Sequence, residues 1–122
     1  MRREIEGAEQ ATLLDWAAMM AGRWPELRLL FHVPNGGDRS KSEAARMKMQ
    51  GVKAGVPDLV LPVARGGYHG LFLELKAAGG RPTQEQKEWI RELQEQGYAA
   101  TVAVGWEAAA KVLANYLEGK KL

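Results

Sequence analysis

The sequence predicts an α/β fold: a small mixed β-sheet flanked by helices, in the order α-β-α-β-β-α-β-α. Three observations lead to this prediction. Segments with apolar residues at helical spacing alternate with short apolar runs typical of strands. Clusters of glycine and proline separate these segments and mark turns. A chain of 122 residues has the length of one domain and can bury one core, so we treat 1–122 as a single domain.

The first elements are expected to be a helix and a strand. From about Glu4 to Ala21, leucine, alanine and methionine recur at helical spacing and form one apolar face. Gly22 ends this helix. The run from Leu27 to Val33 is typical of a strand, and it stops at the turn-forming residues 34–37.

A second helix and two strands follow. The segment 40–50 begins with a serine and a glutamate three residues apart, which is the form of a capping box, and we expect it to be helical. Two apolar runs, 58–63 and 71–77, are joined by the glycine-rich segment 65–70. That linker is typical of a hairpin, so the two strands should be antiparallel neighbours.

The C-terminal third predicts helix, strand and helix. Thr83 caps a helix that runs to about Gln96, and Gly97 ends it. A strand over 99–104 and a helix over 107–117 complete the chain. The unit from 71 to 104 is therefore a strand-helix-strand crossover, which predicts parallel strands.

The composition excludes several classes of protein. No apolar run approaches the roughly 18 residues of a membrane span, and no apolar stretch follows the basic N-terminus as in a signal peptide, so we expect no membrane partner. The chain has no cysteine, which excludes disulfides and thiolate metal sites and fits a cytoplasmic location. No phosphate-binding glycine-lysine loop is present, so no nucleotide cofactor is expected.

Basic residues are unevenly distributed along the chain. The net charge of +2 is too small to indicate nucleic-acid binding by itself. The segment 39–53, however, has five basic residues and one acidic residue, which suits a phosphate backbone; a solvated helix face is the alternative. The five basic residues are Arg39, Lys41, Arg46, Lys48 and Lys53.

The strongest functional signal is Asp58 with the pair Glu74 and Lys76. Pro57 and Asp58 open one apolar strand, and the pair lies inside the next. Charged groups in buried strands cost several kcal/mol unless they are paired or metal-bound. Strand alternation places Glu74 and Lys76 on one face, about 6–7 Å apart, and an adjacent strand would bring Asp58 beside them. We interpret these residues as a divalent-cation site that hydrolyses a phosphodiester.

Each residue has an expected role. Asp58, Glu74 and the main-chain carbonyl of Leu75 would supply the oxygen ligands that Mg²⁺ prefers. The metal would lower the pKa of a bound water and neutralise charge on the scissile phosphate. Lys76 would orient the attacking water or stabilise developing negative charge. A buried glutamate-lysine pair on an edge strand is the structural alternative.

Three segments carry a family resemblance: Gly-Val-Lys-Ala-Gly-Val-Pro-Asp-Leu-Val at 51–60, Leu-Glu-Leu-Lys at 73–76 and Gly-Gly-Arg-Pro-Thr-Gln-Glu-Gln at 79–86. They resemble the VRR-NUC nuclease family, a branch of the PD-(D/E)XK superfamily, over nearly the whole chain. The resemblance implies a restriction-endonuclease-like core and a Mg²⁺- or Mn²⁺-dependent DNA endonuclease. It also implies that Asp58 and Glu74 are metal ligands.

By the same resemblance, Lys76 is the catalytic lysine. The family also has a glutamate on its first helix, for which Glu6 is preferred and Glu9 is the alternative. A glutamine follows the catalytic strand in the family, and Gln86 matches it. A capping box with Thr83 would account for Gln86 equally well.

Further expectations concern DNA. Asn35 matches the family's loop after the first strand and could contact DNA, although Asn-Gly also forms turns. Lys53 could contact a phosphate just before the catalytic strand. His32 is expected to be packed in its strand. Stand-alone members of the family look like homodimeric Holliday-junction resolvases, which implies branched DNA as the substrate and a homodimer. A nickase or flap nuclease, a non-catalytic nucleic-acid-binding module and a protein-interaction domain are the alternatives.

Overall fold

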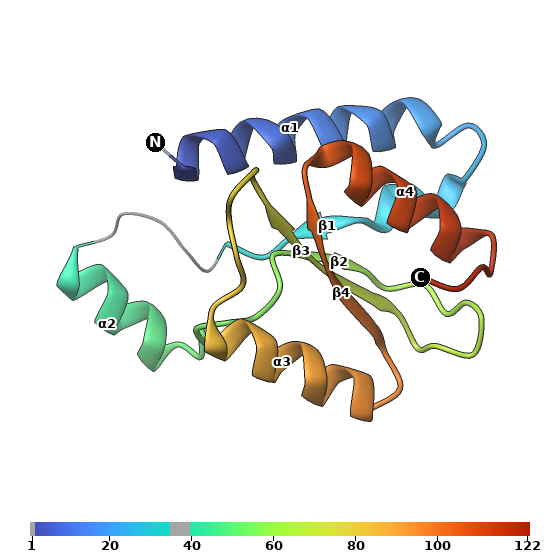
Figure 1. Cartoon of the computed structure of the whole chain (residues 1–122). Coiled ribbons are helices and arrows are strands. Elements are labelled where there is room, and N and C mark those ends of the chain that lie inside the picture. Colours follow the sequence, from blue (N-terminus) through green and yellow to red (C-terminus); the bar gives the residue numbers. More distant parts are fainter. Residues whose placement is uncertain (1, 35–39) are drawn as a thin grey trace.

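A four-stranded sheet lies at the centre of the computed structural model, which describes residues 2–34 and 40–122 (Figure 1). Apart from one additional 3₁₀ helix, η1, the order of elements is the predicted one. The elements are α1 (Arg2–Met20), η1 (Pro25–Leu29), β1 (Phe31–His32), α2 (Lys41–Met49), β2 (Leu59–Leu61), β3 (Leu71–Lys76), α3 (Gln84–Glu95), β4 (Ala99–Val104) and α4 (Trp106–Leu117).

The sheet is mixed, with the strand order β1-β2-β3-β4. β2 pairs antiparallel with both β1 and β3, whereas β3 and β4 are parallel. Gly66 and Gly67, in the β2–β3 connection, have φ angles of 55° and 88°, as a two-residue hairpin turn with right-handed twist requires. The predicted antiparallel hairpin and parallel crossover are therefore both present.

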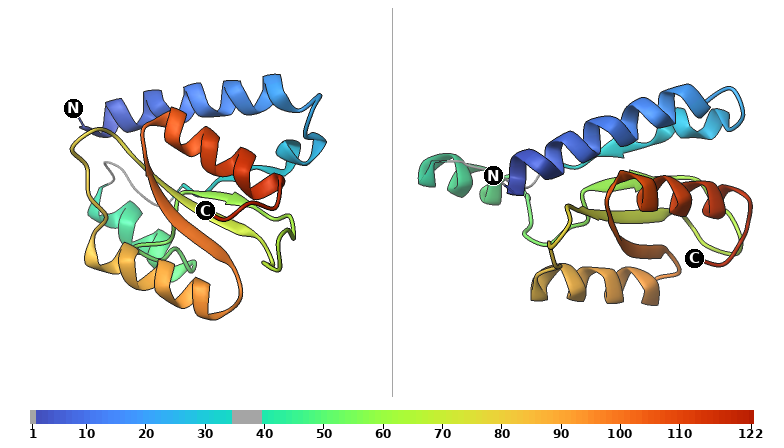
Figure 2. Two further views of the ribbon diagram at one scale, coloured as in Figure 1. Left: turned by 45° about the vertical axis from the view of Figure 1, so that its right-hand side comes forward. Right: turned by 45° about the horizontal axis from the view of Figure 1, so that its top comes forward.

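Helices cover both faces of the sheet. α1 and α4 pack together on one face, and α3 lies on the other (Figure 2). Leu71, Leu73 and Leu75 of β3 point to the first face, where they pack with Leu13 of α1 and Leu113 of α4. The alternate residues of β3 consequently point to the face of α3.

The predicted strand over 27–33 is largely wrong. Pro25 begins a 3₁₀ helix, and only Phe31 and His32 remain as strand. Side chains three residues apart point the same way in a 3₁₀ helix. Leu27 and Leu30 can therefore both pack against the core, which the alternation of a strand would prevent.

β2 is also shorter than the predicted strand over 58–63. It ends before Pro62, which has no N–H to donate to the sheet. It begins after Asp58, which leaves the backbone of that residue at the end of the ladder. Among the described residues no helix has the length and hydropathy to cross a membrane.

Candidate active site

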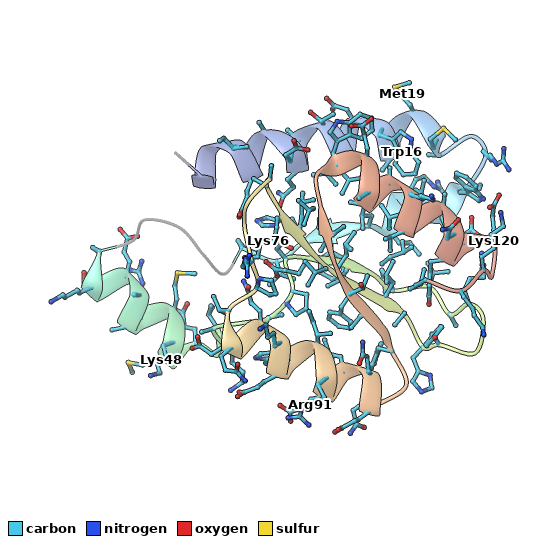
Figure 3. The ribbon with its side chains drawn as sticks, viewed as in Figure 1. Trp16, Met19, Lys48, Lys76, Arg91 and Lys120 are labelled. Atoms are coloured by element: carbon cyan, nitrogen blue, oxygen red, sulfur yellow. The ribbon has the colours of Figure 1, made fainter. Side chains whose placement is uncertain are left out.

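Glu74 and Lys76 lie together at the C-terminal end of β3. They point to the same face of the strand, and Glu74 Oε2 is 3.4 Å from Lys76 Nζ. Only 3% of Glu74 and 8% of Lys76 is exposed. In the view of Figure 3, Lys76 lies between α1 and α3. The pair is therefore largely removed from solvent, where its charges interact strongly.

Asp58 joins this pair through the β2–β3 register. Leu59 pairs with Leu73, so Asp58 stands opposite Glu74, one residue beyond the ladder. Asp58 Oδ1 accepts a 3.0 Å hydrogen bond from the N–H of Leu75. The N–H and C=O of a strand residue point to the same side, so the Leu75 carbonyl points to the β2 side of β3 as well.

The positive charge near Asp58 and Glu74 does not balance the negative charge of the two carboxylates. Burial and the negative charge of Asp58 raise the pKa of Glu74 from 4.5 to about 7, and the charge of Glu6 acts in the same direction. Lys76 only partly offsets these effects. Burial also raises the pKa of Asp58, although its hydrogen bond from Leu75 and the charges of His32 and Lys76 lower it.

Glu74 Oε1 is buried and has no hydrogen-bond partner among the described residues. A divalent cation fits this arrangement, because it would bind the unpartnered Glu74 oxygen and balance the charge of two carboxylates that repel each other. In the described part of the chain, no three histidine, aspartate or glutamate side chains form a metal cluster. The residues that would hold such a cation are Asp58, Glu74 and the Leu75 carbonyl, with water or substrate oxygens completing the coordination that Mg²⁺ prefers.

Gln86 links α3 to the site. Its Nε2 donates a 3.1 Å hydrogen bond to Glu74 Oε2. Its Oε1 accepts from the Thr83 N–H at 2.8 Å, and its own N–H donates to Thr83 Oγ1 at 3.1 Å. The capping box and the contact with the candidate site are therefore both present, in one side chain.

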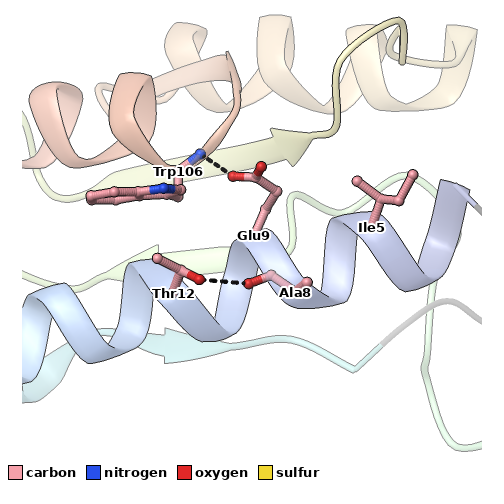
Figure 4. Close-up of a pocket in the computed structure, with 5 residues that line it drawn as sticks. All are labelled: Ile5, Ala8, Glu9, Thr12 and Trp106. Atoms are coloured by element: carbon pink, nitrogen blue, oxygen red, sulfur yellow. Dashed lines mark hydrogen bonds between the residues drawn. The ribbon is translucent and has the colours of Figure 1, made fainter.

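The two glutamates of α1 occupy different surroundings. A Cβ placed on Gly80 would lie 3.4 Å from Glu6 Oε2 and 3.4 Å from Lys76 Cβ, so Glu6 reaches the end of β3. Glu9 Oε2 accepts a 2.6 Å hydrogen bond from the N–H of Trp106, the first residue of α4 (Figure 4). Glu6 therefore lies beside the acidic site, and Glu9 caps a helix.

His32 is the neighbour of the site that the sequence did not predict. It is exposed, so the expectation of a packed histidine is wrong. Its Nδ1 lies 3.1 Å from the carbonyl oxygen of Asp58. No sequence signal indicated this contact, because the predicted strand ran too long to fix the register of β1 against β2.

Three of the five candidate DNA-binding residues lie within the described part of the chain. Lys41 and Arg46 are exposed on α2, and Lys53 is exposed in the loop before Asp58. Asn35 and Arg39 lie outside the described residues. The helix α2, which has Lys41 and Arg46, lies away from the sheet that has the acidic residues (Figure 1).

Comparison with known proteins covers most of the chain. A family model of the VRR-NUC domain matches residues 6–106. A solved structure of a VRR_NUC domain protein is 34% identical in sequence, with a TM-score of 0.81, over 96% of this chain and 91% of that chain. No curated protein matches the chain significantly. The family match extends from Glu6 past Gln86 and so includes every residue of the candidate site described above.

Proposed function

Because the chain belongs to the VRR-NUC nuclease family, we propose that it is a divalent-metal-dependent endodeoxyribonuclease selective for branched DNA, in the manner of a Holliday-junction resolvase. The observation that carries the proposal is the meeting of Asp58, Glu74 and Lys76 at the end of β3. An acidic pair with an unpartnered oxygen and one adjacent ammonium has the groups that phosphodiester hydrolysis needs.

Asp58, Glu74 and the Leu75 carbonyl would hold Mg²⁺ or Mn²⁺, which supplies a water of lowered pKa and neutralises charge on the scissile phosphate. Asp58 is held for this by the N–H of Leu75, and Glu74 by the amide of Gln86. Both hydrogen bonds fix carboxylate orientation before substrate arrives.

Lys76 orients the reacting groups. Its ammonium is 3.4 Å from Glu74 Oε2, which holds the lysine side chain at the site. From there it can donate to the attacking water or to a phosphate oxygen as negative charge develops. Such charge stabilisation is strongest in a site that excludes water, and both side chains of the pair are buried.

Selection of branched DNA and a dimeric state complete the proposal. The exposed basic residues Lys41, Arg46 and Lys53 would contact phosphates, which carry no information on base sequence. Recognition by DNA shape is therefore favoured over recognition by sequence. A twofold pair of sites would suit a four-way junction, which needs two matched cuts.

The test is a cleavage panel of supercoiled plasmid, four-way junction, flap and linear duplex, with Mg²⁺, with Mn²⁺ and with EDTA. We expect metal-dependent cleavage that is greatest on the junction and is lost in Glu74→Gln and Lys76→Met. Lys120→Met, which removes an exposed lysine, is the control and should cleave normally.

Binding without cleavage under every metal would instead favour a non-catalytic nucleic-acid-binding module. Equal cleavage of flap, junction and duplex would leave an endonuclease and remove the junction preference. Light scattering should give twice the 13.4 kDa chain mass, and a monomer would contradict the dimer.

A further inference from the structure

α2 stands apart from the rest of the fold. None of its nine residues is buried, and it lies at one end of the molecule away from the sheet (Figures 1 and 2). Ser40 caps it by accepting from the Glu43 N–H at 3.1 Å. A nine-residue helix with so little packing is marginal in water. α2 therefore presents most of its surface to solvent, where a partner can reach it.

One face of α2 has the shape and the positive charge to bind a polyanion. Lys41, Ala44, Ala45 and Lys48 follow the i, i+3, i+4, i+7 spacing of a single helix face, and all four are exposed; we call them the lysine stripe. The two lysines are separated by about 10 Å along the axis at 1.5 Å per residue. The alanines between them let the helix approach a row of phosphates closely.

The net positive charge of the chain is concentrated in and just after this helix. Residues 40–53 contain four basic residues and one acidic residue, so the other 108 residues contain thirteen basic and fourteen acidic ones. The candidate active site itself gathers Asp58, Glu74 and Glu6, which repel a DNA backbone. Attraction of DNA must consequently come from another surface, and residues 40–53, with four basic residues and one acidic residue, have a net charge of +3.

We propose that the lysine stripe of α2 binds the phosphate backbone of the duplex that flanks the scissile phosphate. The inference rests on the proposed function for the identity of the polyanion as DNA. A second copy of this chain is a poorer occupant, because its own stripe has the same charge and its remaining residues are almost neutral.

The test measures binding without cleavage. A short labelled duplex is titrated by fluorescence anisotropy with full-length Glu74→Gln protein in EDTA, between about 50 and 200 mM salt. Adding Lys41→Gln and Lys48→Gln should weaken binding to every sequence and reduce the slope of log K against log salt by about 2, because each phosphate contact contributes about 0.9.

The matched control is Lys120→Gln with Lys121→Gln, which removes the same charge. Lys120 lies at the opposite side of the molecule from Lys48 (Figure 3), and this control should leave the slope unchanged. Equal slopes for the two double variants would overturn the proposal, as would an unchanged slope in the stripe variant.

A substitution that unfolds α2 would also weaken DNA binding, so the variants must keep the helix. Glutamine is a good helix former, so the stripe variant should keep α2. A second variant, Ala45→Glu, keeps a helix-forming residue while placing a carboxylate between the two lysines, and it should weaken binding as well. Unweakened binding by Ala45→Glu would contradict contact at this face. Because no cleavage is involved, failure here leaves the nuclease proposal standing, and failure of the cleavage panel leaves this one standing.

Discussion

Gln86 Nε2 donates a 3.1 Å hydrogen bond to Glu74 Oε2 and so joins the first turn of α3 to the C-terminal end of β3. The Oε1 atom of the same glutamine accepts from the Thr83 N–H. One amide therefore caps a helix and orients a buried carboxylate. Glu74 Oε1 is the oxygen that this arrangement leaves without a partner among the described residues.

The two roles of Gln86 can be separated by comparing Gln86→Ala with Thr83→Ala. Each variant removes part of the capping box and should lower the free energy of unfolding by about 1 kcal/mol. Only Gln86→Ala leaves Glu74 unsupported, so we expect it alone to lower the rate of junction cleavage, by about 10–100-fold. Urea denaturation and single-turnover cleavage measure the two effects. Equal rates for the two variants would show that Gln86 only caps.

The raised pKa of Glu74 predicts a pH-dependent stability. In the unfolded chain Glu74 ionises near 4.5, and in the folded protein near 7. The folded state binds the proton more tightly, so unfolding becomes easier as pH rises between these values. The loss is at most about 3 kcal/mol at 1.36 kcal/mol per pKa unit. The raised pKa of Asp58 acts in the same direction.

Glu74→Gln tests this dependence, because the amide does not ionise. In EDTA we expect the variant to be more stable than the wild type at pH 8 and to lose most of the decline above pH 5. Chemical denaturation at the two pH values measures it. Parallel stability curves for the two proteins would mean that Glu74 ionises normally.

A divalent cation should stabilise the protein more strongly at high pH than at low pH. The cation binds the ionised forms of Asp58 and Glu74, so it competes with protons. Stabilisation follows the mass-action relation for a ligand of the native state. We expect Mn²⁺ to raise the melting temperature at pH 8, with little effect at pH 5 and none in Asp58→Asn. Glu95→Gln, on the exposed side of α3, should respond like the wild type. An equal response in Asp58→Asn would place the metal elsewhere.

Glu6 and Glu9 should differ in the effect of substitution. Glu9→Ala removes the acceptor of the Trp106 N–H at the start of α4 and should cost about 1–2 kcal/mol of stability with cleavage retained. Glu6→Gln removes a negative charge beside Glu74 and should not destabilise the fold. We expect it to reduce cleavage instead. Thermal melts with cleavage rates decide this, and the reverse pattern would reassign the helix-1 carboxylate to Glu9.

Gly55 sets the approach of the loop before Asp58 to α3. It has a φ of 92°, and a Cβ there would lie 2.8 Å from the backbone of Glu85. Gly51 has a similar φ of 98° with no atom within 4 Å. Both alanine variants incur about 1–2 kcal/mol for the left-handed backbone, but only Gly55→Ala adds a clash. Gly55→Ala should therefore be the less stable protein and should lose cleavage as Asp58 shifts. Equal melting temperatures would contradict the close approach.

The sequence by itself determined which residues meet at the candidate site and most of the fold. Strand alternation placed Glu74 and Lys76 on one face, and the hairpin between 58–63 and 71–77 brought Asp58 opposite them. Ser40 and Thr83 marked the starts of α2 and α3, and Gly97 marked the end of α3. These signals are local, since each depends on residues only a few positions apart.

Tertiary structure decided what depends on packing between distant segments. Packing of Leu27 and Leu30 against the core turned most of a predicted strand into η1, and the shortened β1 placed His32 against the Asp58 carbonyl. The position of α1 over the sheet brought Glu6 to the end of β3 and Glu9 to α4. Periodicity gives the face on which a side chain lies. It does not give the distant residue that the chain brings against that face.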